Sequence, residues 1–391
     1  MSRFFLNLKN MKNVSKFFKV AAFCLCIAAP NTTMAQIETS ISNGQQKSTI
    51  DLSSVDKFFE IADKIQLNKD VSENDWKALS RTLGYWGRFA PFEIIPEMLM
   101  VAFSDNQQSK RDSILNLPAK IILQDHLARL TQITLINFLD MKEHQKELKL
   151  FRETYDFDAI KNRSIDRLKS FLIYPVVDTL IVFPQIALLC QEPDAQFNLI
   201  GDIPIIIMDF NMFYKQTEEK RVNFLAHEMF HSYRDNIRAE FVNYSNNYLN
   251  LYIELIRIQN EGIADLIDKK GIECLIDDDD PQELIDLILS TYENTPQILN
   301  NLDIIVNSYI NREISEEQLN KKVNRFFLFG GHANGLYMAK LIKNAGLMDE
   351  MLKTFYSPVE FLKLYNKAAK KENIYVLSDE FIKFVENLEK E

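Results

Sequence analysis

The chain has 391 residues, of which 47% are hydrophobic and 26% are charged. This composition is sufficient for a large apolar core and excludes an intrinsically disordered protein. Only 10 glycines and 11 prolines are present, which excludes collagen-like and low-complexity chains. The formal net charge of −10 makes a nucleic acid or an anionic membrane surface an unfavourable partner. We therefore expect a folded globular protein that does not bind nucleic acid.

Residues 1–35 predict a secretory signal peptide. Five basic residues and no acidic one precede the apolar run from Val20 to Ala29, and the small-residue end at Ala35 follows it. This order of basic, apolar and small residues is typical of an export signal that is cleaved, here after Ala35. The run is short for a transmembrane helix, so an uncleaved anchor is the weaker alternative. We expect an exported protein (periplasmic, cell-envelope or extracellular) with no membrane span in the mature chain and a net charge of about −15.

Residues 36–49 are polar and are typical of a flexible leader. Apolar periodicity then predicts a helical N-terminal part over residues 50–170. One helix is expected at Trp76–Leu83, preceded by an N-cap within Ser72–Asp75, and helical periodicity continues over Lys120–Leu150. Residues 171–391 are expected to form the second part of the protein.

Two short β-branched runs in the middle of the chain predict a small sheet. They are Thr179–Phe183 and Ile203–Asp209, and Pro and Gly bound them. The apolar stretch Tyr174–Cys190 is also compatible with a membrane span, but it contains Asp178 and two prolines, so buried strands are the better interpretation. Ile203–Asp209 fits either an edge strand that pairs with an extended substrate or an interior strand.

Helices are expected again in the last part of the chain. Periodicity predicts them over Glu218–Asp235 and over Tyr248–Lys270, the second ended by Gly271. Asp277–Asp280 reads as a solvated acidic turn, because it lacks the spaced ligands of a calcium loop. Ser357-Pro358-Val359-Glu360 predicts a helix start with Ser as the cap, Pro at the first helical position and Glu closing a capping box.

Two cysteines, Cys190 and Cys274, remain after removal of the signal. In an oxidising compartment they could form one disulfide, and two buried thiols are an equal alternative. The chain has no Cys-x-x-Cys pair, so we expect neither a cysteine metal site nor a redox motif.

The segment Phe224-Leu-Ala-His227-Glu228-Met-Phe-His231 contains a His-Glu-x-x-His motif. Two histidines four residues apart project from one helical face, so both imidazoles can bind one zinc ion, and Glu228 can reach a metal-bound water. At this composition, His-acid-x-x-His would occur by chance in about 1% of such chains. The alternative is that both histidines are partly buried helix residues with Glu228 on the surface.

Glu261 is the preferred third ligand. It follows His231 by thirty residues, and Asp265, one helical turn later, can accept the free N–H of a ligating imidazole. Glu240 and Glu254 are competing ligands, but no carboxylate follows either of them after four residues. The alternative for Glu261 is an ordinary solvated helix acid.

A glycine cluster near residue 330 is the third notable feature. Three of the chain's 10 glycines, Gly330, Gly331 and Gly335, lie beside His332. Glycines allow close approach of a backbone, and His332 or Tyr337 could donate a hydrogen bond to an oxyanion near zinc. The alternative is a helix start with a structural histidine and a core tyrosine.

The motif pair resembles the signature of the gluzincin group of zinc metallopeptidases, in which His-Glu-x-x-His is followed one helix later by Asn-Glu-x-x-Ala/Ser-Asp. Asn260–Asp265 supplies the second half of that signature. The metzincin pattern fails because Arg234 and Ile237 stand where Gly and His are required. Over roughly residues 170–345 the layout is also similar to bacterial secreted proteins described as zinc-dependent peptidases of uncharacterised function.

The resemblance implies a predominantly α-helical α+β fold of zincin type, with a small β-sheet followed by two zinc-ligand helices and a helical C-terminal part. Residues 171–391 would then be the catalytic part, with Zn²⁺ as cofactor. The implied site has Glu228 as general base, His332 or Tyr337 as oxyanion donor, Asp265 orienting a ligand, and His227, His231 and Glu261 holding the metal.

The function expected from these residues is that of a secreted zinc metallopeptidase, a hydrolase that cleaves peptide or protein substrates with a zinc-activated water. A catalytically inactive zincin-fold protein that binds or scaffolds in the cell envelope is the alternative from another class. Zinc-dependent hydrolysis of a non-peptide amide is a third possibility. The chain has no Gly-x-Met-Glu-Asn motif, so nothing favours an aminopeptidase.

Overall fold

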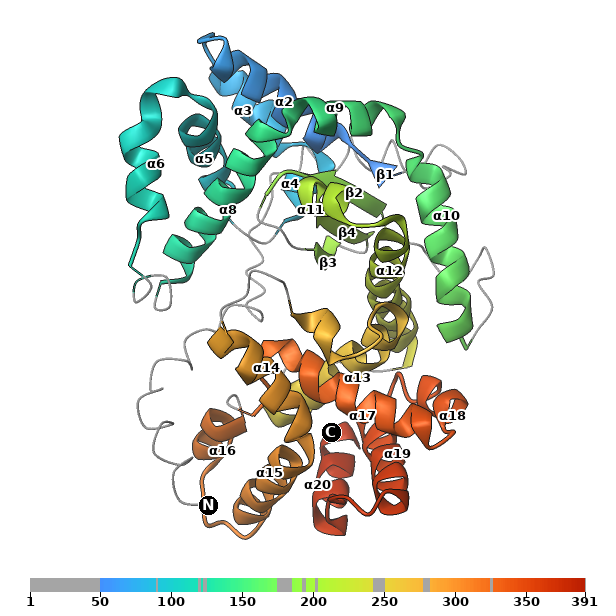
Figure 1. Cartoon of the computed structure of the whole chain (residues 1–391). Coiled ribbons are helices and arrows are strands. Elements are labelled where there is room, and N and C mark those ends of the chain that lie inside the picture. The colour runs from blue at the N-terminus through green and yellow to red at the C-terminus, as the bar shows by residue number, and fades with distance from the viewer. Residues whose placement is uncertain are drawn as a thin grey trace. The chain divides into compact units, whose positions relative to one another are not determined.

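The computed structural model describes residues 50–88, 91–118, 121, 125–173, 185–191, 195–200, 203–241, 250–276, 282–323 and 326–390. The expected signal peptide, the leader, the strand at 179–183 and the acidic turn at 277–280 lie outside these residues. The described chain is mostly helical and contains one four-stranded sheet (Figure 1). This confirms the expected α-helical α+β class.

Two compact units divide the chain. The described residues 50–162 and 185–221 belong to the first unit, and 163–173 and 222–390 belong to the second. The sheet therefore groups with the N-terminal helices, whereas the sequence placed it with the zinc helices. The physical reason is strand pairing, because the first described strand, at Ile50–Asp51, is hydrogen-bonded to a strand at Gln185–Leu189.

The sheet of the first unit has the order β1-β2-β4-β3, with β1 at Ile50–Asp51, β2 at Gln185–Leu189, β3 at Ala195–Ile200 and β4 at Ile203–Asp209. β2 is parallel to β1 and β4, and β3 is antiparallel to β4. β4 is thus an interior strand, so the alternative that it offers a free edge to a substrate is wrong. Its apolar run is continuous because residues 205–208 are fully buried.

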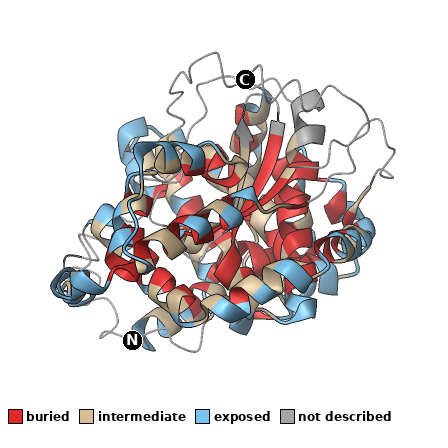
Figure 2. Cartoon of the chain, turned by 90° about the horizontal axis from the view of Figure 1, so that it is seen from above, coloured by how far each residue is buried: buried red, intermediate tan, exposed pale blue. Residues whose placement is uncertain are grey.

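Helices of the first unit pack against β2 and β4, and the strands are largely buried (Figure 2). The helices of this unit are α2 (Ser53–Gln66), α3 (Glu73–Ser80), α4 (Leu83–Gly87), α5 (Ile94–Phe103), α6 (Gln108–Leu115), α8 (His126–Glu143), α9 (Gln145–Thr154), the first part of α10 (Phe157–Leu168), α11 (Phe210–Lys215) and the first turn of α12 (Glu218–Phe241).

The expected caps can be compared directly with the helix ends. The Ser72 hydroxyl accepts the Asp75 N–H at 3.2 Å and the Asp75 carboxylate accepts the Ser72 N–H at 2.9 Å, which confirms the N-cap of α3 as a capping box. The helical pattern expected over Lys120–Leu150 is interrupted at His144, between α8 and α9. There the His144 Nδ1 lies 3.0 Å from the Asp140 backbone oxygen.

Lys161 carries a testable stability cost. It lies on α10 with 6% of its surface exposed, and burial lowers its pKa to about 8, against a partial offset by Asp158. The pKa of Lys161 in the folded state lies below the unfolded value of 10.5. Burial of the charged side chain therefore lowers the free energy of unfolding by its full amount below pH 8, and this loss disappears as the pH rises to 10.5. We expect Lys161→Met to raise the free energy of unfolding at pH 7 by roughly 1–3 kcal/mol. Chemical denaturation at pH 7 and pH 10 measures this, and an equal gain at both pH values would assign the effect to packing instead of charge.

The described residues of the second unit form helices and connecting turns, with no strand among them. The unit contains the end of α10 and the remainder of α12, then α13 (Asn250–Asp268), α14 (Gln282–Glu293), α15 (Thr295–Ile310), α16 (Glu316–Val323), α17 (His332–Asn344), α18 (Met348–Leu352), α19 (Pro358–Lys371) and α20 (Asp379–Lys390). α13 is central, because α16, α17, α19 and α20 all pack against it (Figure 1).

Two of the expected helix ends in this unit need correction. α13 ends at Asp268, and Gly271 has an extended φ of −160° at the start of a short 3-10 turn, so Gly271 is not the helix cap. Ser357 does cap α19 by accepting the Glu360 N–H at 3.2 Å. The Glu360 carboxylate, however, accepts from Lys363 at 2.8 Å, so the reciprocal half of the box is missing.

The α13–α17 contact depends on two glycines. A Cβ at Gly262 would lie 2.4 Å from the backbone oxygen of Gly335, and a Cβ at Gly335 would lie 2.4 Å from the backbone oxygen of Ile258. Real Cβ contacts are longer than this, so the two helix backbones touch only because both residues lack a side chain. This contact brings the start of α17 against the middle of α13.

Both described cysteines are free, Cys190 being buried and Cys274 exposed. The expectation of two buried thiols holds only for Cys190. Among the described residues, none of the helices combines the length and the apolar character that crossing a membrane requires.

Candidate metal centre

The His-Glu-x-x-His motif lies on α12, within the second unit. The rings of His227 and His231 are 4.8 Å apart, with 80° between their planes. The two residues are 3% and 8% exposed, and Glu228 between them is 7% exposed. The spacing of four residues has therefore placed both imidazoles on one buried face of the helix, as predicted.

Glu261 of α13 lies opposite this histidine pair. Its Oε2 is 3.4 Å from the His231 Nε2 and 3.7 Å from the His227 Nε2. The ligand atoms of the three residues all lie within 4.8 Å of one another. With zinc–ligand bonds of about 2.1 Å, tetrahedral geometry separates ligand atoms by about 3.4 Å. The two histidine–Glu261 distances of 3.4 and 3.7 Å are close to this value, so the donor set fits a zinc ion.

The alternative third ligands are placed differently. The Glu254 carboxylate accepts from the Arg257 guanidinium at 3.0 Å, two helical turns before Glu261. The side chain of Glu240 lies outside the described residues. Glu261 is therefore the glutamate that the structure brings to the histidine pair.

The carboxylate that holds His227 differs from the one predicted. The His227 Nδ1 lies 2.9 Å from Asp268 Oδ1 and 3.7 Å from Asp265 Oδ1, so Asp268 accepts its hydrogen bond. Asp268 is not among the predicted site residues. Its position on α13 was a usable signal, because Glu261, Asp265 and Asp268 follow the i, i+4, i+7 spacing of one helical face.

Asp265 instead contacts His332, the first residue of α17. Its two carboxylate oxygens lie 3.0 and 3.1 Å from the His332 Nδ1. The other ring nitrogen of His332, Nε2, lies 3.5 Å from Glu261 Oε2. The structure therefore brings His332 to the predicted metal ligands, and the His332 side chain is 31% exposed.

The glycine cluster explains this position of His332. Phe329, Gly330 and Gly331 have φ values of 55°, 64° and 88°, a left-handed run that turns the chain into α17. Gly331 also packs closely on α13, because a Cβ there would lie 3.2 Å from the Ile258 side chain. The close approach allowed by the glycines thus sets His332 beside Asp265.

Tyr337, the other predicted oxyanion donor, is placed elsewhere. Its ring packs against Tyr292 of α14, with ring centroids 5.3 Å apart. Five residues rotate the chain by about 140° away from His332 around the helix. Of the two candidates, the described contacts bring only His332 to the cluster.

The cluster is strongly coupled by charge. Burial lowers the pKa of His227, but the neighbouring Asp268 and Glu261 carboxylates raise it by a larger amount, so that the net pKa is about 10. Burial likewise opposes the charged form of Glu261, yet His231 and His332 hold its pKa well below the ordinary value. The pKa of His332 is raised by Asp265 and Glu261 against the effect of burial. The buried carboxylates stabilise the protonated form of the neighbouring histidines, and the same negative charge favours a bound cation.

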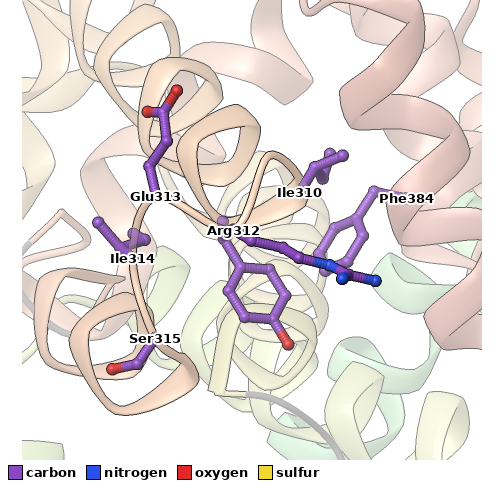
Figure 3. Close-up of a pocket in the computed structure, with 7 residues that line it drawn as sticks. Ile310, Arg312, Glu313, Ile314, Ser315 and Phe384 are labelled. Carbon is purple, nitrogen blue, oxygen red and sulfur yellow. The ribbon is translucent and has the colours of Figure 1, made fainter.

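A separate pocket of about 570 Å³ lies in the second unit, at the turn between α15 and α16 (Figure 3). Ile310, Arg312 and Phe384 are among its lining residues. None of the candidate metal ligands lines this pocket, so we do not assign it to the metal centre.

Two histidines and a glutamate on adjacent helices form a ligand set of the kind that catalytic zinc sites use. Residues 89–374 match the family described as "Putative zinc dependent peptidase (DUF5700)". The match covers more than half of the chain, and the chain belongs to this family. No curated protein matches the chain, and no solved structure does.

Proposed function

We propose that the protein is an exported zinc metallopeptidase in which His227, His231 and Glu261 hold the metal. The observation that carries the proposal is the convergence of two imidazole nitrogens on one carboxylate oxygen, at 3.7 and 3.4 Å. Membership of a family described as zinc-dependent peptidases supports the same chemistry. The substrate is then a peptide or a protein.

A zinc ion bound by these residues would lower the pKa of a water molecule and polarise the scissile carbonyl. Glu228, beside His227 on α12, takes the proton of the attacking water and passes it to the leaving nitrogen. The His332 Nε2 donates a hydrogen bond to the developing oxyanion. Because the His332 Nδ1 donates its proton to Asp265, donation from Nε2 requires protons on both ring nitrogens. The carboxylates of Asp265 and Glu261 favour that state by raising the pKa of His332.

Metal analysis of the purified protein, combined with a peptide-library cleavage assay, tests the proposal. We expect about one zinc per chain, cleavage that a chelator abolishes, and recovery on addition of Zn²⁺. Purified protein without stoichiometric zinc would contradict the metal assignment. Zinc without cleavage of any peptide would favour the inactive binding or scaffold protein, unless a screen of non-peptide amides found turnover.

Zinc binding is expected to release protons. The neighbouring Asp268 and Glu261 carboxylates raise the pKa of His227 to about 10 against the effect of burial, so His227 is protonated at pH 7.5 before it binds zinc and must lose a proton to ligate it. The apparent zinc affinity should therefore rise with pH between pH 6 and pH 9. Isothermal titration calorimetry in buffers of different ionisation enthalpy measures the release, and His227→Ala should reduce both the release and the affinity. Binding without proton uptake by the buffer would contradict this prediction.

A further inference from the structure

Lys269 lies directly after α13, behind the candidate metal ligands. Its side chain is 10% exposed. Its Nζ is 2.7 Å from Asp265 Oδ1 and 2.9 Å from Asp268 Oδ2. Asp265 is fully buried and the Asp268 side chain is 11% exposed. One largely buried ammonium group thus joins two largely buried carboxylates.

Each of these carboxylates holds a different histidine. Asp268 accepts from the His227 Nδ1 at 2.9 Å. Asp265 accepts from the His332 Nδ1 at 3.0 Å. Lys269 therefore connects a candidate metal ligand to the candidate oxyanion donor through two acidic residues, without contacting either histidine itself in the described ion pairs and hydrogen bonds.

The ammonium group stabilises this arrangement of the two carboxylates. Two carboxylates that share a buried site repel each other, and the Lys269 ammonium offsets this repulsion in addition to the charge of the neighbouring histidines. Without Lys269 the remaining repulsion would favour one carboxylate turning away or taking up a proton. Either change would weaken the hydrogen bond that orients one of the two imidazoles. The partners of a metal-ligating histidine commonly affect metal affinity for this reason.

We propose that Lys269 is a positioning residue that fixes His227 for metal binding and His332 for catalysis at the same time. The proposal rests on the proposed function for its catalytic half only. Its structural half, the orientation of the two imidazoles, applies to the metal-free protein as well. Lys269 would act through Asp265 and Asp268 and would not touch the substrate.

Three variants separate this role from a general contribution to folding. Lys269→Met keeps the length of the side chain and removes the charge, whereas Lys269→Arg keeps the charge. Lys270→Met is the matched control, because Lys270 is the next residue and is exposed. Thermal unfolding of each variant establishes that it is folded before the other measurements are compared.

The first measurement is histidine-ring NMR of the metal-free, full-length protein. The chain has only 5 histidines, so ring signals can be assigned by single substitutions. We expect Lys269→Met to shift or broaden the Nδ1–H signals of His227 and His332, and Lys269→Arg and Lys270→Met to preserve them. Unchanged signals in Lys269→Met would overturn the proposal, whether or not the protein binds zinc or cleaves peptides.

The second measurement is zinc affinity by competition with a chelating dye, followed by kcat and KM for a peptide substrate. Lys269→Met should weaken zinc binding and lower kcat by about 10- to 100-fold each, with a small change in KM. Lys269→Arg should recover most of both losses. Loss of kcat without any change in the ring signals would assign Lys269 a purely structural role. The same conclusion would follow if the zinc affinity and kcat of Lys269→Arg exceeded those of Lys269→Met by no more than the difference between Lys270→Met and the wild-type protein. A wild-type protein that binds zinc without cleaving peptides would contradict the proposed function and still leave the affinity comparison decisive.

Discussion

Replacing Glu228 with glutamine is expected to lower peptide hydrolysis by roughly 100- to 10,000-fold while zinc stays bound. Glutamine has nearly the same size as glutamate but cannot take a proton from the attacking water. Glu228 is buried, with 7% of its surface exposed, and it is not among the residues whose ligand atoms lie close together. The variant should therefore lose the proton transfer and keep the metal.

Initial rates with a peptide found in the library screen, together with zinc content per chain, measure this outcome. Glu219→Gln is the matched control, since Glu219 is exposed in the first turn of α12, and it should keep the wild-type rate and the metal. If Glu228→Gln retained more than about a tenth of the activity, another group would have to be the base. If it lost zinc, Glu228 would be acting on the metal site itself.

The contacts within single helices were accessible from the sequence because they depend only on spacing. Four residues between His227 and His231 give one helical face whatever the rest of the fold does. The N-cap of α3 at Ser72 is equally local, since its partner Asp75 is three residues away. These features were correctly predicted for the same reason.

The contacts between helices were less accessible. Asp265 and Asp268 occupy the same face of α13, and spacing alone does not decide which of them meets His227. The answer depends on how far α12 and α17 lie along α13, which is a matter of tertiary packing. The Gly262–Gly335 contact sets the position of α17. As a result, His332 is hydrogen-bonded to Asp265 and His227 is hydrogen-bonded to Asp268.

The placement of the sheet depended on the same kind of long-range information. The apolar run in β4 correctly indicated a strand, but its neighbours β2 and β3 determine whether that strand is interior or at an edge. The two-residue strand β1 is too short to give a periodic signal. Its pairing with β2 is nevertheless what assigns the sheet to the first unit.

Gly335→Ala is expected to destabilise the protein and to impair catalysis more than zinc binding. At an ordinary helix position alanine is favoured over glycine by about 1 kcal/mol. At Gly335, however, a Cβ would lie 2.4 Å from the Ile258 backbone oxygen, and that oxygen cannot move without displacing α13. Overpacking of this kind costs roughly 1–3 kcal/mol, so a net loss of stability would identify the helix contact as the cause.

The same displacement should reach His332, which begins α17 three residues before Gly335. Moving α17 away from α13 lengthens the His332 contacts with Asp265 and Glu261, whereas His227, His231 and Glu261 lie on α12 and α13. We therefore expect Gly335→Ala to retain most of its zinc and to show a reduced kcat. Denaturant unfolding, zinc content and steady-state kinetics together measure this pattern.

Gly346→Ala separates displacement from simple loss of stability. Gly346 has a φ of 77°, and a Cβ there would meet no atom of the described residues within 4 Å. Alanine at this position therefore adds backbone strain of about 1–3 kcal/mol without a clash. Gly346 lies beyond the C-terminal end of α17, away from His332 in sequence. Gly346→Ala should thus be destabilised and keep its kcat at a temperature where it is folded. Equal kinetic effects of the two substitutions would show that the α13–α17 contact has no special part in placing His332.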